Sequence, residues 1–150
     1  RVLFRPRHHP LGIAGDYDDV IIDLGAGLDQ NVRMMTVGNG RCLVVCTEEP
    51  TSLTDAYAFI KVTSLEHPST DIRLVVNMAP SMNDGMRVYE TLNKVCEKFL
   101  GLSPVLMGVV RRDNHVRDSI RSQTAMLTRH PTSIAAADVE KIADRLVAEK

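Results

Sequence analysis

The sequence predicts an α/β fold, a mainly parallel sheet with flanking helices. Short, nearly all-apolar runs recur along the chain, as expected of strands buried on both faces of a parallel sheet. Segments with apolar residues at helical spacing lie between these runs, and this alternation is typical of βαβ units. Because no internal repeat or linker divides the sequence, we expect one domain over residues 16–150 after an irregular lead-in over residues 1–15.

Four apolar runs are the expected strands. They are Val20–Leu24, Cys42–Thr47, Arg73–Asn77 and Val105–Val110. The lead-in has neither a strand period nor a helix period and contains two prolines and two glycines. Its one apolar stretch, Val2–Phe4, is short and is followed closely by Pro6. We therefore expect no strand there.

Three segments have helical spacing. In the first two, a serine followed three residues later by an aspartate predicts a capping box, at Ser52–Asp55 and at Ser81–Asp84. The third lies near the end of the sequence and should pack on the sheet. The apolar stripes of the three segments, expected to face the core, are Leu53, Ala56, Tyr57 and Ile60; Met82, Met86, Tyr89, Leu92, Cys96 and Phe99; and Ala135, Val139, Ile142 and Leu146.

Composition excludes several function classes. An apolar fraction of 44% and a charged fraction of 25% are ordinary for a globular protein. A net charge of -1 argues against electrostatic binding of nucleic acid by the chain as a whole. No apolar run is long enough to span a bilayer and the first residues do not resemble a signal peptide, so we expect a cytoplasmic protein. Cys42 and Cys46 would lie about 13 Å apart on one strand, too far for a disulfide, and should be reduced core residues.

The expected strand ends indicate where chemistry could occur, because open α/β sheets bind ligands at the carboxyl ends of their strands. Asp23 lies near such an end, and Gly25 and Gly27 follow it. An acidic residue there can hold Mg²⁺ through water, and glycines allow backbone N–H groups to approach a phosphate. An aspartate before a glycine turn is also common without any function, so these residues alone leave both interpretations open.

Two other chemistries do not fit. A phospho-acceptor receiver domain needs an acidic pair on an earlier strand and a lysine at the end of the last strand, where this chain has Val109-Val110-Arg111. A serine or cysteine hydrolase would need a Gly-x-Ser-x-Gly elbow or a Cys/His arrangement, and neither is found.

Four segments taken together, in this order and spacing, resemble the second half of a MinD/ParA-type deviant P-loop ATPase. They are Tyr17–Gly27, Thr47–Tyr57, Val75–Asn77 and Gly108–Asp113. The run from Thr47 to Lys61 is most similar to the regulators of flagellar number within that family, the FlhG, FleN or YlxH type. The fold implied is an incomplete P-loop NTPase-like domain, the C-terminal half of the nucleotide-binding domain.

The resemblance implies roles for individual residues. Asp23 matches the aspartate that supports Mg²⁺ and the attacking water, and Gly27 matches the switch glycine that faces the γ-phosphate, with Gly25 beside it. Asn77 matches the residue that hydrogen-bonds the adenine. Arg111 and Asp113 fall in the loop that wraps the base. ATP and Mg²⁺ are the implied cofactors.

The sequence also departs from the family pattern. It contains no Gly-Lys-Ser/Thr, so the phosphate-binding loop and its lysine are missing, and we expect that this chain alone does not hydrolyse ATP. In the family, the strand that carries that loop lies between the strands that match Val20–Leu24 and Cys42–Thr47. The absence of this strand predicts a gap in the sheet, and Val2–Phe4 is too short to fill it. Arg111 and Glu48 each replace a usual proline.

The resemblance implies that the intact protein is a nucleotide switch, with a homodimer, flagellar assembly or positioning proteins as partners, and peripheral association with the inner face of the cell membrane. A non-catalytic α/β module that binds proteins is the alternative. A ParA-like DNA-binding protein is a weaker one, based on a late basic cluster in which Arg117 and Arg121 share a helix face. The members of this cluster are Arg111, Arg112, Arg117, Arg121, Arg129, His115 and His130.

Overall fold

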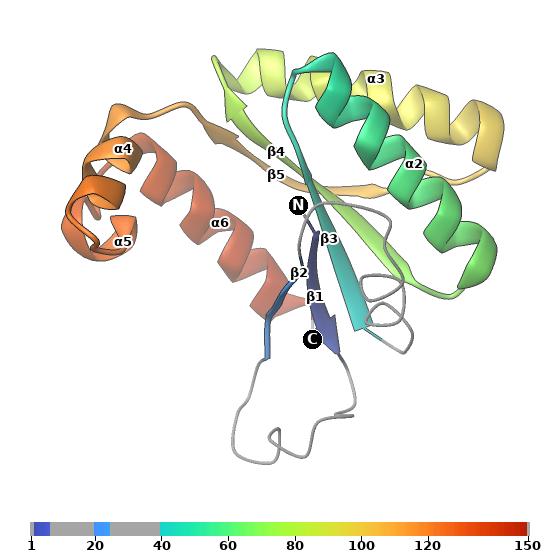
Figure 1. Cartoon of the computed structure of the whole chain (residues 1–150), viewed down its shortest axis with the longest axis horizontal. Helices are drawn as coiled ribbons and strands as arrows, with labels where there is room; N and C mark the ends of the chain where they lie inside the picture. Colours follow the sequence, from blue (N-terminus) through green and yellow to red (C-terminus); the bar gives the residue numbers. More distant parts are fainter. Residues whose placement is uncertain (1, 7–19, 25–39, 150) are drawn as a thin grey trace.

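The computed structural model describes residues 2–6, 20–24 and 40–149 and has the predicted α/β architecture (Figure 1). Its strands form one sheet in the order β2-β1-β3-β4-β5. The strands are β1 (Val2–Pro6), β2 (Ile22–Leu24), β3 (Gly40–Cys46), β4 (Asp71–Ala79) and β5 (Val105–Arg111). The helices are α2 (Pro50–Glu66), α3 (Met82–Leu100), α4 (Asn114–Arg121), α5 (Met126–Arg129) and α6 (Ile134–Ala148). The four predicted strands are confirmed, with ends shifted by up to two residues.

The sheet is parallel except at β1. Strands β3, β4 and β5 pair in parallel, whereas β1 runs antiparallel to both of its neighbours, with Leu3 opposite Asp23 in β2 and opposite Leu43 in β3. The prediction that the lead-in is irregular is therefore wrong for Val2–Pro6, and so is the prediction that this stretch leaves a gap. The unpaired N–H and C=O groups of two facing edges can be satisfied by an extended segment of either direction, which explains the reversed strand. Residues 7–15 lie outside the described residues.

The helix starts follow the predicted capping chemistry in only one of two cases. The Ser81 hydroxyl accepts a hydrogen bond from the Asp84 N–H (3.1 Å), so the second capping box is confirmed. The first is wrong, because α2 begins earlier, at Pro50 after the N-cap residue Glu49. Ser52 thus lies inside the first turn, where its hydroxyl accepts a hydrogen bond from the Thr47 N–H (2.9 Å) and closes the turn after β3.

The two faces of the sheet carry separate apolar clusters. Helices α2 and α3 cover one face and α6 covers the other (Figure 1). The cluster under α2 and α3 includes Ile60, Leu74 and Leu92. The cluster under α6 is smaller and consists of the buried residues Leu43, Val75, Met107 and Ile142. Consecutive residues such as Leu74 and Val75 point to opposite faces, as expected of a strand buried on both sides.

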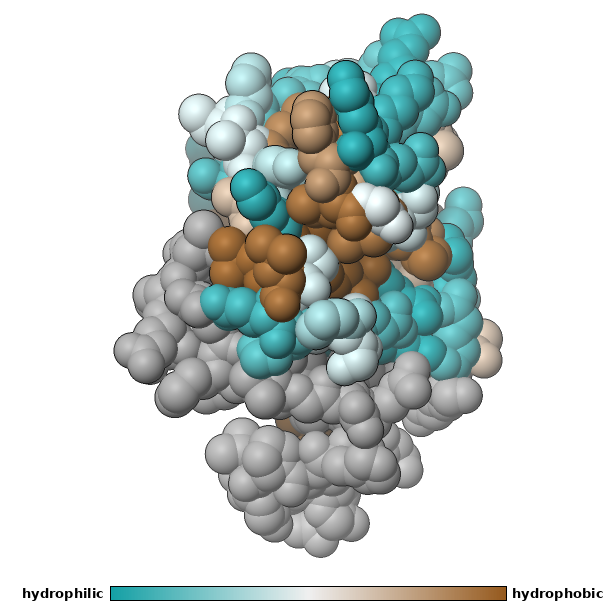
Figure 2. Space-filling view, turned by 90° about the vertical axis from the view of Figure 1, so that its right-hand side faces the viewer, coloured by the Kyte–Doolittle hydropathy of each residue, from teal (hydrophilic) through white to brown (hydrophobic). Residues whose placement is uncertain are grey.

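The stripe predicted for α3 is only partly buried. Leu92 and Cys96 are in the core, but Phe99 is 64% exposed and Met82 and Met86 are exposed as well. Figure 2 shows apolar surface on the side where α2 and α3 end, and the exposed apolar residues of those last turns are Leu65 and Phe99. The helical period places a residue on a face but does not show how much of that face the sheet covers.

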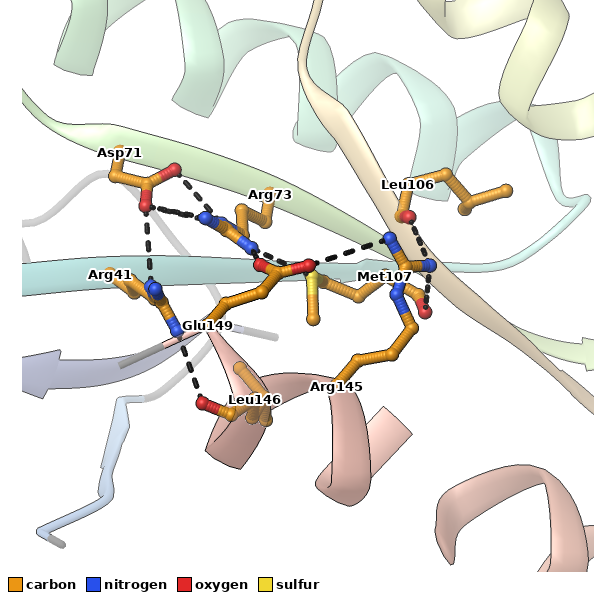
Figure 3. Close-up of polar contacts among 8 residues, drawn as sticks. All are labelled: Arg41, Asp71, Arg73, Leu106, Met107, Arg145, Leu146 and Glu149. Carbon is orange, nitrogen blue, oxygen red and sulfur yellow. Dashed lines mark hydrogen bonds and ion pairs between the residues drawn. The ribbon is translucent and has the colours of Figure 1, made fainter. Parts of the chain in front are cut away.

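Charged groups hold the last turn of α6 against the sheet (Figure 3). The buried Arg41 donates to the Leu146 carbonyl (3.1 Å) and pairs with Asp71 (3.4 Å). Arg73 pairs with both Asp71 and Glu149. From α6, Arg145 donates to the Leu106 and Met107 carbonyls of β5 (both 2.9 Å). This ionic network replaces the large apolar contact found under α2 and α3.

All three cysteines are free and buried, as predicted. Burial raises the pKa of the thiols to about 12 for Cys42 and to about 11 for Cys46 and Cys96. They are therefore protonated core residues at neutral pH. Among the residues described, no helix has the length and apolar character required to cross a bilayer.

Candidate functional site

The carboxyl ends of β3, β4 and β5 form one edge of the sheet, because these three strands are parallel. Helices α2, α3 and α4 begin just beyond this edge, so their N-terminal ends also lie along it. Of the predicted site residues, Asn77, Arg111 and Asp113 lie at or next to this edge.

The end of β4 has an unusual backbone. Met78 has a φ of 59°, the left-handed region that only glycine adopts freely, and its side chain is 47% exposed. The pairing of β4 with β5 shifts between Val76 and Ala79. The Asn77 side-chain oxygen accepts a hydrogen bond from the Met78 N–H (2.9 Å), which helps to hold this conformation. Such strain is common where a ligand binds. The remaining lone pair of this oxygen and the amide NH₂ of Asn77 have no other partner among the described residues.

Arg111 is held by a residue that the sequence did not indicate. Asp138 of α6 accepts hydrogen bonds from the Arg111 backbone N–H (3.1 Å), from Nε (2.8 Å) and from Nη2 (2.8 Å). Burial pushes the pKa of Asp138 upward, but the hydrogen bonds from Arg111 outweigh it and the pKa is lowered. The Arg111 guanidinium is thus turned toward α6.

Arg112 spans the edge. Its guanidinium pairs with Glu48, which follows β3 (3.6 Å), and its backbone N–H donates to the Ala79 carbonyl at the end of β4 (2.8 Å). Because β4 lies between β3 and β5, the ion pair crosses the end of β4. Both side chains are exposed, so the pair is weak. The two residues that replace family prolines, Glu48 and Arg111, therefore each have an ion-pair partner.

Asp113 joins the starts of two helices. One of its carboxylate oxygens accepts from the His115 N–H (2.9 Å) and lies 2.8 Å from His115 Nδ1, and the other accepts from the Ala135 N–H (3.2 Å). The bond from the His115 N–H is the main cause that lowers the pKa of Asp113 to about 2. This carboxylate is the N-cap of α4 and a tether for α6, and its predicted contact with a base stays a prediction.

Most of the basic cluster is engaged. Asp118 pairs with Arg129 (2.6 Å) and with His130 (2.7 Å), and these bonds lower its pKa to about 2, with the larger contribution from Arg129. Arg117 and Arg121 have no ion-pair partner within the described part of the chain and are exposed on α4.

Asp23 is not brought to Asn77. Asp23 of β2 pairs with Leu3 of β1, and Leu3 pairs with Leu43 of β3. Leu43 in turn pairs with Arg73 of β4, which lies four residues before Asn77. Asp23 is thus about 13 Å back along the strand direction and about 14 Å away across the sheet. Gly25 and Gly27 lie outside the described residues, so their predicted roles stay predictions. Over residues 2–6, 20–24 and 40–149, no group of three or more His, Cys, Asp or Glu side chains could hold a metal ion.

Asp138 and Met78 are the residues of this edge that sequence reasoning missed. A signal existed for Asp138, which shares a helix face with Ala135 and Ile142 and so is an acidic residue in an otherwise apolar stripe. Such a residue requires a basic partner when it is buried. No pattern in the sequence identifies Met78, because its conformation arises from the irregular pairing of β4 with β5.

Comparison with known proteins identifies relatives. The chain is 32% identical over 134 residues to the antiactivator FleN of Pseudomonas aeruginosa, covering 89% of this chain and 48% of FleN. It is 24% identical over 139 residues to the flagellum site-determining protein YlxH of Helicobacter pylori, covering 92% of this chain and 47% of YlxH. The chain is a homologue of FleN and YlxH.

A third relative is an uncharacterized ATP-binding protein of Methanocaldococcus jannaschii, 30% identical over 134 residues, with 87% of this chain and 47% of that protein covered. The chain spans about half the length of these curated relatives. No protein-family model matches it. The resemblance to MinD/ParA-type proteins that the sequence indicated is confirmed by the similarity to FleN and YlxH.

Proposed function

We propose that the chain is the part of an ATP-dependent, MinD/ParA-type switch that binds the adenine base, and that the intact protein regulates flagellar number or placement. The similarity to YlxH, a flagellum site-determining protein, supports the flagellar role, and the ATP-binding relative supports the nucleotide. In the intact protein, two copies would meet face to face, bind flagellar assembly or positioning proteins and associate peripherally with the membrane.

The observation that carries this proposal is Asn77 at the strained end of β4, beside the loop formed by residues 111–113. An asparagine amide pairs with adenine through two bonds, because its NH₂ donates to N7 and its oxygen accepts from N6. The Asn77 amide keeps a donor and an acceptor for this purpose. Guanine has a carbonyl in place of the N6 amine and would be rejected.

The Asn77 amide fits the base, whereas the part of the chain that the structure describes contains no group of three or more His, Cys, Asp or Glu side chains that could hold a metal ion. Mg²⁺ support by Asp23 and phosphate contacts by Gly25 and Gly27 stay proposals for the intact protein. Without a Gly-Lys-Ser/Thr loop, the chain alone should not turn over ATP. Phosphate release by the pure chain, above that of a boiled sample, would contradict this.

Nucleotide titration of the ¹⁵N-labelled chain tests the proposed base site. We expect AMP to shift the amide signals of residues 77–79 and 111–113, GMP to shift them much less, and inorganic triphosphate to leave them unchanged. The variant Asn77→Ala should lose the response to AMP, and Asn93→Ala in the middle of α3, away from this edge, should keep it. Equal responses to AMP and GMP, or none at these residues, would contradict the proposal.

A second candidate is a non-catalytic module that binds proteins. The apolar surface at the ends of α2 and α3, with Leu65 70% exposed, favours it (Figure 2). This candidate predicts no response to AMP.

A DNA-binding role would rest on Arg117 and Arg121, and it requires a gel shift at low salt that these two arginines control.

A further inference from the structure

We propose that Asp138 is a positioning residue for the adenine base, which acts by holding the loop of residues 111–113 beside Asn77. Asp138 itself would not touch the nucleotide. This inference rests on the proposed function, and it concerns a residue on a helix that covers the opposite face of the sheet from α2 and α3.

The contact between Asp138 and Arg111 is built as an anchor. The Asp138 side chain is 1% exposed, and its two oxygens accept three hydrogen bonds from one residue, of which one comes from the backbone. Two parallel bonds between a guanidinium and a carboxylate fix direction as well as distance. Since a buried carboxylate without its partner is costly, the pair strongly disfavours any other arrangement of this loop.

Each residue of the loop is tied to a neighbouring element by at least one hydrogen bond. Arg111 is tied to α6 through Asp138, Arg112 to Ala79 through its backbone N–H (2.8 Å), and Asp113 to the start of α6 through the Ala135 N–H (3.2 Å). Ala79 follows directly on Asn77 and Met78. The same loop therefore connects α6 to the end of β4, and a change at Asp138 is transmitted to the Asn77 edge.

The anchor also accounts for the arginine that stands where family members usually have proline. A proline fixes the backbone of a loop by its ring. Arg111 lacks that constraint, but the bond from its N–H to Asp138, together with the guanidinium pair, restrains the same stretch of backbone.

The other end of α6 offers a matched control. Glu149 pairs with Arg73 and Arg145 and also holds α6 on the sheet (Figure 3). It follows the last residue of α6, whereas Asp138 lies near the first. Asp138→Asn and Glu149→Gln each exchange a carboxylate for an amide of nearly the same shape. Both should loosen α6, whereas only Asp138→Asn should release the loop.

The experiment compares AMP and GMP affinities of the labelled chain and its variants, together with amide hydrogen exchange of residues 111–113 without nucleotide. If Asp138→Asn leaves the loop in its binding arrangement about a tenth of the time, AMP should bind about tenfold more weakly. Exchange at 111–113 should rise, and the weak GMP response should not change.

Glu149→Gln should keep the AMP affinity and the exchange of these amides. The double variant Arg111→Met/Asp138→Leu removes both charges without leaving one unpaired, so it should fold and still bind AMP weakly.

An unchanged AMP affinity in Asp138→Asn, or an equal loss in Glu149→Gln, overturns the inference while leaving the proposed function intact. A wild-type chain without any response to AMP overturns the proposed function, and the inference with it.

Discussion

The two faces of the sheet are held by different forces. Under α2 and α3, a continuous apolar cluster contains fully buried residues such as Ile60 and Leu74. Under α6 the apolar cluster is small, and the helix is anchored at both ends by ion pairs, through Asp138 at its start and Glu149 at its end. One face therefore depends on the area removed from water, and the other on hydrogen-bond geometry and charge.

This difference bears on the proposed site, because one of the two ionic anchors of α6, the Asp138–Arg111 pair, holds the loop of residues 111–113. Ion pairs with defined geometry respond to pH and to single substitutions without loss of the core. A helix held in this way can pass a change in a strand-end loop to the rest of the molecule. We expect the two faces to respond differently to the perturbations below.

The largest effect is expected from a cavity under α2 and α3. Ile60→Ala should lower the free energy of unfolding by about 3–5 kcal/mol, because the side chain is fully buried and its neighbours are packed on every side. Ile142→Ala under α6 should cost only about 2 kcal/mol, since that cluster is smaller and partly open. Urea unfolding of both variants makes the comparison, and equal losses would show that the two faces are alike.

An intermediate effect is expected at Gly108, where β5 touches α6. A Cβ added there would lie 2.6 Å from Ile142 Cγ1, so Gly108→Ala should push α6 outward and cost about 1–3 kcal/mol. The double variant Gly108→Ala/Ile142→Ala should cost less than the sum of the single variants, because the smaller side chain makes room. Gly85→Ala, which meets Val109 on the opposite face, is the matched control and should not be relieved by Ile142→Ala. Strict additivity at Gly108 would contradict the contact.

The smallest effect is expected from mild acid. Asp113, Asp118 and Asp138 have lowered pKa values in the folded chain, to about 2 for the first two. As the pH falls, these three carboxylates bind protons in the unfolded chain first, near pH 4, and in the folded chain only at lower pH. Their contribution to the free energy of unfolding is therefore complete above about pH 4 and is lost as the pH falls toward about 2. Amide exchange of α4 and α6 should therefore rise before that of α2 and α3. A uniform rise across both faces would contradict the account.

Much of the fold follows from local patterns. Apolar runs predicted β3, β4 and β5 because these strands are buried on both sides, and Ser81 predicted the start of α3 because capping needs only neighbouring residues. Strand β1 was missed because its pairing depends on two distant edges of the sheet. Ser52 was mistaken for a cap because its partner, the Thr47 N–H, belongs to the turn after β3.

The candidate site was predictable in part for a similar reason. The resemblance to MinD/ParA-type ATPases indicated Asn77, Arg111 and Asp113 from the sequence, and the rule on strand ends agrees with their placement. The rule could not show that Asp138, 27 residues further along the chain, holds Arg111, or that Glu48 pairs with Arg112. It also placed Asp23 at the same edge, whereas the register through β1 leaves Asp23 level with the middle of β3.

The most direct test of the central claim is to read the coding sequence upstream of the codon for Arg1. If the chain is the base-binding half of an ATP-dependent switch, that sequence should encode, in frame, an apolar strand followed by a glycine-rich loop with Gly-Lys-Thr or Gly-Lys-Ser. An in-frame stop, or an unrelated open reading frame, would contradict the claim and would leave a protein-binding module as the better account.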